Sequence, residues 1–479
     1  MTKNALRLRL EACSRFHVVG CSGTEGAAAV SFLAARFGAR RVAAHDVQTD
    51  DAFATSFFSA RDQRPRQETA QALRAYRALP VQWRLGGDYL SGIAAGDALL
   101  LPQDWDRYGR NREPVERHRR NRGLVLLSFD LYYLYFAGTI IGITGTKGKT
   151  TTCHLARNLL AAAGREVYIS GNDRFSKQIL PHVDRLPPSA YLILETSNRH
   201  LKHSLFSPHV AVITNIMEDH LQEHDNNPDA YKRTKLKLLR NQTPRCAVIP
   251  GELRLTPPAG IRHCVRVSPA GATGGGTIAY KGKDAFYVAK QGLHLLRIPV
   301  THLPTRLFSE TLLSIIGLAA CLHLPAAAVV QALRQPLDLR NRFEIIGQKS
   351  GITFINDQAA TTPTATLRAV QSVADPFVLI CGGADKGLDY SALAKELDHR
   401  PCRVLLVDSD VAARLLALLR DKAKAVMHHD FRSALFAAYA GAKPGATILL
   451  SPAGAHFYSR FVRSGKNSMR VLYRCLPRK

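Results

Sequence analysis

The sequence predicts an α/β protein of three domains, in which a Rossmann-like domain at each end flanks a central phosphate-loop domain with a mostly parallel sheet. A chain of 479 residues is longer than one hydrophobic core usually organises. Short apolar runs rich in Val, Ile and Leu alternate with helical patterns, as in layered α/β folds. Glycine-rich turns join such a run to a helix near residues 20 and 145. We place the domains at residues 1–138, 139–336 and 337–479.

The first segment has the layout of half a Rossmann fold. A strand "FHVVG" (16–20) leads through "CSGTEG" into a helix over residues 27–38 and a second strand that ends in Asp46. Asp46 follows Gly26 by 20 positions (46 − 26 = 20), the interval at which a ribose or base is held. The glycine fingerprint is weak, because Cys21 stands at its first position if Gly23 and Gly26 are the other two.

The stretch "GITGTKGKTTT" (142–152) predicts a phosphate-binding loop in the second segment. An apolar strand over 139–143 precedes a tight turn, and a helix over 150–163 follows it and is closed by Gly164. Backbone N–H groups at such a helix start attract phosphate. Lys149 would contact the β- and γ-phosphates and the Thr150 hydroxyl a magnesium ion. An incidental lysine in a glycine turn is disfavoured, because strand, glycines, Lys-Thr pair and helix occur in order.

Polar side chains follow three further apolar runs, where α/β proteins bind ligands. Glu195 follows "YLIL", and "NIMEDHLQEH" after "VAVIT" carries His220 with Lys235 on the next helix. Asp357 and Thr361 follow "ITFI" in the third segment, which alternates strands and helices from about residue 337. Each has an ordinary structural interpretation as a strand end, a capped loop or a solvated helix face. Their joint placement favours one active site.

Charge and cysteine content narrow the functional classes. The net charge is +27, and its densest part is "RYGRNREPVERHRRNR" (107–122), which would attract RNA, anionic lipid or an acidic substrate, or form a solvated helix. No aromatic residues alternate with these arginines, so we expect no nucleic-acid partner.

Nine cysteines without a C-x-x-C pair indicate reduced thiols and a cytoplasmic protein. Asp130 interrupts the apolar run 124–143, which therefore predicts two buried strands with a connector and no transmembrane segment.

Several motifs together resemble the Mur ligases, ATP-dependent enzymes that build the peptide stem of bacterial cell-wall precursors. "GTKGKT" (145–150) is similar to the family's phosphate loop and "ETS" (195–197) to its Glu-x-Ser. "TNIMEDHL", followed by Tyr231 and Lys235, is similar to its Asn-x-x-x-Asp-His-Leu segment, and Lys235 follows His220 by 15 residues (235 − 220 = 15). "NRFE", "NDQAATTP" and "LLSPAGA" extend the resemblance through the third segment.

The resemblance implies a substrate and a reaction. "SGN" (170–172) and "ICGGADKGLDYSAL" (380–393) look most like the glutamate-adding members. An ADP-forming ligase would then join D-glutamate to UDP-N-acetylmuramoyl-L-alanine through an acyl phosphate, in peptidoglycan synthesis, and hence serve cell shape and division. We expect a monomer. The alternatives are the same chemistry with L-glutamate or another amino acid, a non-catalytic nucleotide or UDP-sugar sensor, and a basic nucleic-acid-binding NTPase.

The resemblance also implies roles residue by residue. The first domain would bind the UDP-sugar, the second ATP and the third the amino acid. The ATP contacts would be Gly145, Thr146, Lys147, Gly148, Lys149, Thr150, Thr151, Arg342 and Asp357. One Mg²⁺ would bind Thr150 and Glu195, and a second would bind His220 and carbamylated Lys235. The catalytic residues would be Lys149, His220 and Lys235. The UDP-sugar contacts would be Thr24, Asp46, Asn172 and Ser197. The amino-acid contacts would be Thr361, Lys386, Ser451 and His456.

Four positions depart from the family pattern. Lys147 replaces an asparagine or similar polar residue, and "ETLLS" (310–314) stands where His-Asn-x-x-Asn contacts adenine. Ala359 replaces a lysine, and "HFYSRFVRSG" (456–465) replaces the segment that holds the incoming glutamate. We therefore expect altered adenine contacts, and the handedness of the amino acid stays open.

Overall fold

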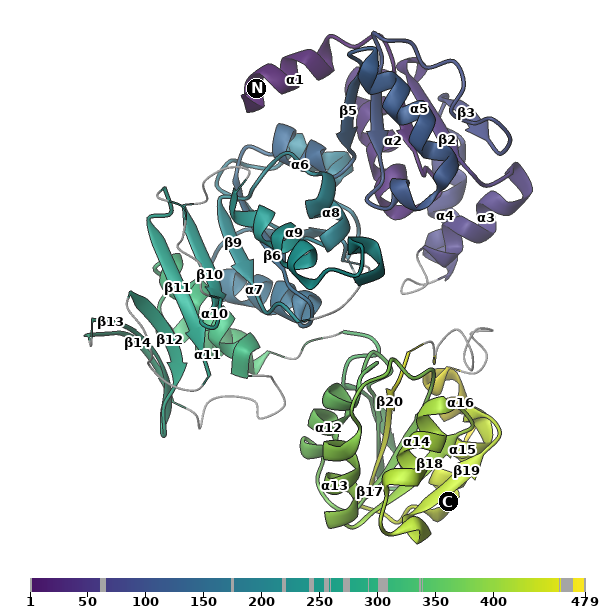
Figure 1. Ribbon diagram of the computed structural model, residues 1–479, viewed down its shortest axis with the longest axis vertical. Helices are drawn as coiled ribbons and strands as arrows, with labels where there is room; N and C mark the ends of the chain where they lie inside the picture. The colour runs from purple at the N-terminus through teal and green to yellow at the C-terminus, as the bar shows by residue number, and fades with distance from the viewer. Residues whose placement is uncertain are drawn as a thin grey trace. The chain divides into compact units, whose positions relative to one another are not determined.

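The protein forms two compact units, residues 1–337 and 338–479 (Figure 1). This computed structural model describes residues 2–60, 66–173, 176–217, 221–240, 245–253, 258, 260–269, 276–291, 293–299, 309–335, 337, 339–455, 457 and 468–477. The first unit contains a five-stranded and a nine-stranded sheet, and the second unit contains a six-stranded sheet. The predicted α/β class is confirmed.

The five-stranded sheet of the first unit is entirely parallel, in the order β3-β2-β1-β4-β5. Its elements, with the helices around it, are α1 (Lys3–Glu11), β1 (Phe16–Val19), α2 (Thr24–Phe37), β2 (Val42–Asp46), α3 (Asp50–Ser59), α4 (Arg66–Arg77), β3 (Gln82–Leu85), β4 (Ala98–Leu101), α5 (Gly109–Arg120), β5 (Leu124–Leu127) and α6 (Asp130–Tyr135). The strand order reverses between β1 and β4. Ligands bind at the carboxyl ends of strands at such a point.

The turn between β1 and α2 depends on two glycines. Gly20 has φ +72°, a left-handed conformation that favours glycine. A Cβ atom on Gly26 would lie 2.2 Å from the carbonyl oxygen of Gly20, so only glycine lets α2 start this close to β1. The glycine of this turn is thus Gly20, one position before Cys21, where the fingerprint spacing predicted it.

The apolar run 124–143 contains a short helix between its two strands. Asp130 begins α6 and is fully buried, and its carboxylate accepts hydrogen bonds from the Leu127 N–H (3.1 Å) and the Ser204 hydroxyl (2.7 Å). Burial raises the pKa of Asp130 to about 6. The predicted pair of buried strands is present, and the connector is itself a buried helix. None of the helices in the described ranges is long and apolar enough to cross a membrane.

Most of the arginine cluster 107–122 forms helix α5. Its arginines are exposed, and several form ion pairs along the helix, including Arg117 with Glu113 (3.3 Å) and Arg119 with Glu116 (2.5 Å). Such exposed pairs contribute little to stability. Among the buried side chains of α5, Val115 belongs to the apolar cluster that contains the strands of the five-stranded sheet.

The nine-stranded sheet has the order β14-β13-β12-β11-β10-β9-β6-β8-β7, and only the β12–β13 and β13–β14 pairs are antiparallel. Its strands and helices are β6 (Thr139–Thr144), α7 (Lys149–Ala162), β7 (Val167–Gly171), β8 (Tyr191–Glu195), α8 (Asn198–His203), β9 (Val210–Ile213), α9 (Pro228–Arg240), β10 (Cys246–Pro250), β11 (His263–Ser268), β12 (Thr277–Lys281), β13 (Ala285–Lys290), β14 (Leu293–Pro299), α10 (Ser309–Cys321) and α11 (Ala326–Arg334). Helices α7, α10 and α11 share one apolar cluster with the sheet, and α8 and α9 share another.

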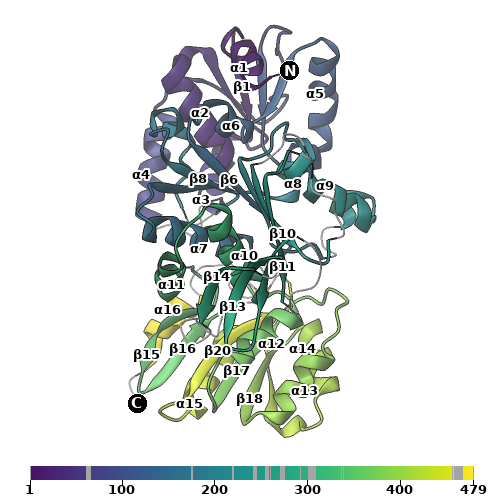
Figure 2. The ribbon, with the colours of Figure 1, turned by 90° about the vertical axis from the view of Figure 1, so that its left-hand side faces the viewer.

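The second unit contains a sheet of order β15-β16-β20-β17-β18-β19, antiparallel only between β15 and β16. Figure 2 shows the succession from β15 to β18. Its elements are β15 (Glu344–Lys349), β16 (Ile352–Asn356), α12 (Pro363–Gln371), β17 (Phe377–Gly382), α13 (Ser391–His399), β18 (Cys402–Val407), α14 (Asp410–Leu418), β19 (Ala425–His428), α15 (Phe431–Gly441), β20 (Thr447–Ala453) and α16 (Met469–Cys475). Helices α12 and α13 pack in one apolar cluster and α15 and α16 in the other, on opposite faces of the sheet (Figure 1).

Candidate functional site

The predicted phosphate loop connects β6 to α7 as expected. Gly148 caps the helix with φ +80°, and Gly145 has φ +151°. A Cβ atom on Gly145 would lie 1.9 Å from the Thr214 hydroxyl oxygen. Glycine is therefore required at both positions, at Gly148 by its backbone conformation and at Gly145 also by the neighbouring chain.

Thr214 and Asn215, which follow β9, form hydrogen bonds with the backbone of this loop. The Thr146 N–H donates to the Asn215 carbonyl oxygen (3.0 Å), and the Lys147 N–H donates to the Asn215 side-chain oxygen (2.9 Å). The Thr214 hydroxyl donates to the Lys147 carbonyl oxygen at 2.7 Å. Parallel strands β6 and β9 are adjacent, so "TN" of the resembled motif lies against the loop. The hydrogen bonds of Lys147 named here involve its N–H and its carbonyl oxygen, so they do not depend on which side chain stands at this position.

Lys149 lies over the loop at the start of α7. Its ammonium group donates to the carbonyl oxygens of Gly145 (2.9 Å) and Thr146 (3.0 Å). Thr150 is buried in the first helical turn, while Thr151 is partly exposed. Thr311, in the segment "ETLLS" at the start of α10, has its hydroxyl oxygen 3.5 Å from where a Cβ of Gly148 would be.

Glu195 ends β8, next to β6, and is only 3% exposed. One carboxylate oxygen, Oε1, accepts a hydrogen bond from the Asn172 amide at 3.0 Å. The other, Oε2, is buried and has no hydrogen-bond donor within the described ranges. A buried carboxylate oxygen without a donor costs free energy unless a cation occupies the space beside it. Glu195 therefore fits a hard cation such as Mg²⁺.

Lys235 on α9 points back to the phosphate loop. It is 1% exposed, and its Nζ donates to the Gly145 carbonyl oxygen at 3.0 Å. The same nitrogen lies 5.1 Å from the centre of the Tyr231 ring. The structure thus brings Lys149, Glu195 and Lys235 to one edge of the sheet, around the loop. His220, expected to complete the set, lies outside the described residues.

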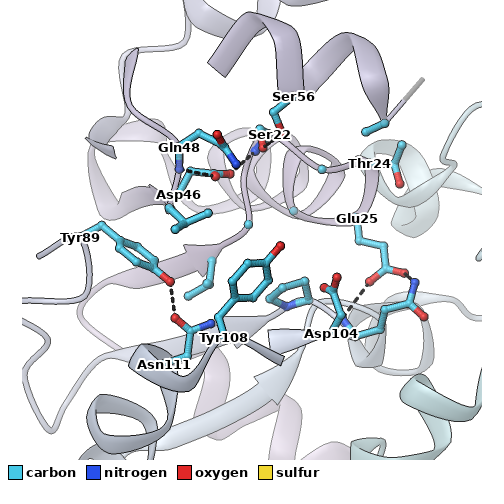
Figure 3. Close-up of a pocket in the computed structure, with 18 of the residues that line it drawn as sticks. Ser22, Thr24, Glu25, Asp46, Gln48, Ser56, Tyr89, Asp104, Tyr108 and Asn111 are labelled. Atoms are coloured by element: carbon cyan, nitrogen blue, oxygen red, sulfur yellow. Dashed lines mark hydrogen bonds between the residues drawn. The ribbon is translucent and has the colours of Figure 1, made fainter. Parts of the chain in front are cut away.

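A pocket of about 250 Å³ lies where β1 and β4 end (Figure 3). Thr24 lines it from the first turn of α2, and Asp46 lines it from the end of β2. The Asp46 carboxylate accepts hydrogen bonds from the N–H groups of Ser22 (2.7 Å) and Gln48 (3.0 Å). Asn172, which follows β7, also reaches the pocket.

Two side chains of this pocket were missed in the sequence. Gln103 follows β4 and bonds to both Asn172 and Ser197, two residues expected to contact the UDP-sugar. Glu25 on α2 accepts from the Gln103 side chain at 2.9 Å. The sequence does contain an indication of Gln103, because it is the first polar side chain after the apolar run "ALLLP", where α/β proteins bind ligands. Its partners could not be predicted, because the sequence alone does not show which strands lie beside β4.

In the second unit, Asp357 and Thr361 follow β16, Lys386 follows β17, and Ser451 lies in β20. The Asp357 carboxylate accepts from the Phe343 N–H (3.0 Å) and the Ser451 hydroxyl (3.2 Å), and burial raises the pKa of Asp357 to about 7. The Lys386 ammonium lies 3.5 Å from the Thr361 hydroxyl oxygen.

The remaining predicted residues of this unit differ in exposure. Arg342 is exposed and Ser451 is fully buried. His456 lies outside the described residues.

The sheet order and the phosphate loop between β6 and α7 define a nucleotide-binding α/β protein. Two family models match, the Mur ligase middle domain over residues 143–256 and the Mur ligase glutamate ligase domain over residues 341–454. The chain belongs to the Mur ligase family.

Similar proteins include ligases named for D-glutamate and for L-glutamate. The UDP-N-acetylmuramoylalanine–D-glutamate ligase of Symbiobacterium thermophilum is 28% identical, covering 80% of this chain and 85% of that protein. The UDP-N-acetylmuramoyl-L-alanine–L-glutamate ligase of Xanthomonas axonopodis pv. citri is 30% identical, covering 68% and 71%. Among solved structures, the UDP-N-acetylmuramate-alanine ligase of Thermotoga maritima aligns with a TM-score of 0.56 at 20% identity, covering 94% of this chain and 99% of that chain. This last likeness confirms the three-domain fold.

Proposed function

We propose that this protein is an ATP-dependent, ADP-forming ligase that joins D-glutamate to UDP-N-acetylmuramoyl-L-alanine in peptidoglycan precursor synthesis. The observation that carries the proposal is the buried Glu195 oxygen without a donor, beside a phosphate loop held by Lys149. Membership of the Mur ligase family and the names of the relatives supply the substrate. Retention of Lys149, Glu195 and Lys235 disfavours a non-catalytic sensor.

The D configuration is the better supported choice for the amino acid. Sequence identity does not distinguish D-glutamate from L-glutamate as the substrate. The relative named for D-glutamate is 28% identical to this chain, and the relative named for L-glutamate is 30% identical. The alignment with the former covers 80% of this chain and that with the latter 68%. Thr361 and Lys386 would hold the glutamate carboxylates, which need cations or N–H groups. Ser451 would act through Asp357, to which its hydroxyl donates.

The loop residues would act on the phosphoryl group that leaves ATP for the alanyl carboxylate. The Lys149 ammonium would move from the loop carbonyls to the phosphoryl oxygens, and the loop N–H groups would hold the other phosphates. Thr150 and Glu195 would bind one Mg²⁺, and His220 and Lys235 a second. The metal ions would supply positive charge that neutralises the phosphoryl and acyl oxygens. Glutamate nitrogen would then displace phosphate from the acyl phosphate.

Carbamylation of Lys235 would resolve a conflict of charge. A lysine ammonium repels Mg²⁺, whereas the carbamate formed from the neutral amine and CO₂, with loss of one proton, offers anionic oxygen ligands. The Lys235 side chain is 1% exposed and its Nζ reaches the Gly145 carbonyl oxygen of the phosphate loop, where the second metal ion would lie.

The UDP-sugar would occupy the pocket at the ends of β1 and β4. Thr24 and the start of α2 would receive its diphosphate, since helix N-termini attract anions. Asp46 would accept a hydrogen bond from ribose or base, as acidic residues at this place do in Rossmann-like folds. Asn172 and Ser197 would meet the sugar near the metal site.

We also propose a monomer that works in the cytoplasm. None of the nine cysteines forms a disulfide, which suits a reducing compartment. Light scattering after size exclusion should give a mass near 52.7 kDa. A mass of twice that value would contradict the monomer.

The decisive experiment is phosphate release from ATP with UDP-N-acetylmuramoyl-L-alanine and each glutamate enantiomer. We expect release with D-glutamate, a product heavier by one glutamyl residue, and background without either enantiomer. Greater activity with L-glutamate would reverse the handedness alone. ATP binding with no turnover on any amino acid would favour the sensor.

A further inference from the structure

The Gln103 side chain joins three segments that are distant in the sequence. Its Nε2 donates to Glu25 Oε1 (2.9 Å) and Asn172 Oδ1 (3.0 Å), and its Oε1 accepts from the Ser197 hydroxyl (2.5 Å). Both amide hydrogens and the oxygen are therefore used. Only one orientation fits, because the flipped amide would place its oxygen against the Glu25 carboxylate and the Asn172 oxygen.

This orientation fixes that of Asn172. With its oxygen facing the Gln103 amide, Asn172 must direct its own Nδ2 to Glu195 Oε1, at 3.0 Å. The opposite orientation would set two oxygens against each other at Glu195. The Glu195 carboxylate is thereby held by Oε1, which leaves Oε2 without a donor in the described part of the chain.

A second set of contacts anchors Gln103 itself. The Gln103 N–H donates to Glu25 Oε2 at 3.3 Å, and His200 Nε2 lies 2.7 Å from Glu25 Oε1. His200 Nδ1 accepts from the Ser197 N–H at 3.2 Å, so Nε2 carries the hydrogen that Glu25 accepts. The Phe129 ring stacks on the His200 ring, with 4.0 Å between the ring centres. The hydrogen bonds close into a ring through Gln103, Ser197, His200 and Glu25.

We propose that Gln103 is a positioning residue for the metal site, acting through Asn172 on Glu195; this rests on the proposed role of Glu195 in binding Mg²⁺. A ligating carboxylate binds a cation well only when its rotamer is held by further hydrogen bonds, and loss of such a bond typically weakens metal binding about 10- to 100-fold. Gln103 and Asn172 provide that hold, with Glu25 and His200 fixing Gln103 from the other side.

The test measures metal binding directly. Mn²⁺, which takes the same oxygen ligands, would be titrated into the full-length protein with ADP, and free Mn²⁺ followed by electron paramagnetic resonance. We expect Gln103→Leu to raise the Mn²⁺ dissociation constant about 10-fold, with ADP binding without metal unchanged. Gln103→Glu keeps the shape but cannot donate to Asn172, and should weaken Mn²⁺ at least as much.

Two further variants make the result specific. Asp106→Asn is the matched control, because Asp106 bonds to Lys202 (2.6 Å) and His203 (3.2 Å) on α8 without reaching Glu195, and it should bind Mn²⁺ normally. Equal weakening in Asp106→Asn, or wild-type affinity in both Gln103 variants, would overturn the proposal. Glu195→Gln should bind Mn²⁺ poorly. If it binds Mn²⁺ as the wild type does, the metal site of the proposed function is wrong as well. If Glu195→Gln weakens Mn²⁺ binding but the Gln103 variants do not, only the role of Gln103 is rejected.

Discussion

The charged residues of the candidate sites differ in burial and in their hydrogen-bond partners. Glu195 is a buried anion with one oxygen left without a donor in the described structure, and Lys235 is a buried lysine at the same edge of the sheet. Lys386 is exposed in the second unit, near Thr361. Burial removes the first two side chains from water, whereas Lys386 stays in contact with solvent.

Lys235→Ala should be largely inactive and partly restored by formate or acetate. A short carboxylate can enter the space left by the side chain and supply the anionic oxygen that we assign to the carbamate. Phosphate release measured with increasing formate tests this. Lys232→Ala, on the exposed face of the same helix, is the control and should be active without formate. Full activity of Lys235→Ala, or no rescue by any short acid, would contradict a carbamylated ligand.

Lys386→Ala should raise the KM for glutamate about 10-fold or more and change the KM for ATP little. A lost charge-assisted hydrogen bond to a carboxylate is worth roughly 1.5–3 kcal/mol, and one factor of ten is about 1.4 kcal/mol. Initial rates over both substrates separate the two constants. Lys395→Ala, exposed on α13, is the control. Parallel changes in both KM values would show that Lys386 only supports its own loop.

At the scale of elements, the parts readable from the sequence were those whose signal is local. Apolar strands and the Gly145–Gly148 turn were predicted because their residues are neighbours in the chain. Helix α6 was missed because "DLYYLY" is buried on every side and shows no helical period. Gln103 was missed because its contacts lie far away in the sequence, with Glu25 on α2 and with Asn172 after β7 in the other sheet of the unit.

A pair of buried histidines links strands β1 and β2 and should make the first unit sensitive to acid. His17 Nδ1 and His45 Nε2 are 2.9 Å apart, and His17 Nε2 is 3.1 Å from Asp97 Oδ2. Burial lowers the pKa of His45 to about 3 and also lowers that of His17. An unfolded histidine titrates near 6.5, so below that pH the unfolded chain binds protons that the folded chain does not. Stability present above pH 6.5 is therefore lost as the pH falls toward 3.

The free energy of unfolding of the first unit should fall by about 1.4 kcal/mol per pH unit for His45 between pH 6 and 4. Urea unfolding at successive pH values measures the slope. His45→Gln should reduce that slope by close to one proton, whereas His294→Gln, at an exposed position, should leave it unchanged. An unaltered slope in His45→Gln would show that the histidine is protonated in the folded state.

At the scale of the whole molecule, the two units have separate hydrophobic cores. Each apolar cluster of buried residues draws its members from one side of residue 338: three clusters lie in residues 1–337 and two in residues 338–479. A core that shares no residues with its neighbour can fold without it. The same division places the phosphate loop and the pocket at the ends of β1 and β4 in one unit, and the expected glutamate contacts in the other.

Residues 338–479 expressed alone should therefore fold and unfold cooperatively in urea, with the midpoint that this unit shows in the full chain. Leu379→Ala removes a fully buried side chain of β17 and should destabilise the fragment by about 2–5 kcal/mol. In the full chain it should shift only the transition of this unit. Ile193→Ala, buried equally in β8, is the counterpart and should shift only the other transition. If the full chain shows a single urea transition, and both substitutions shift its midpoint, the two cores unfold as one cooperative unit.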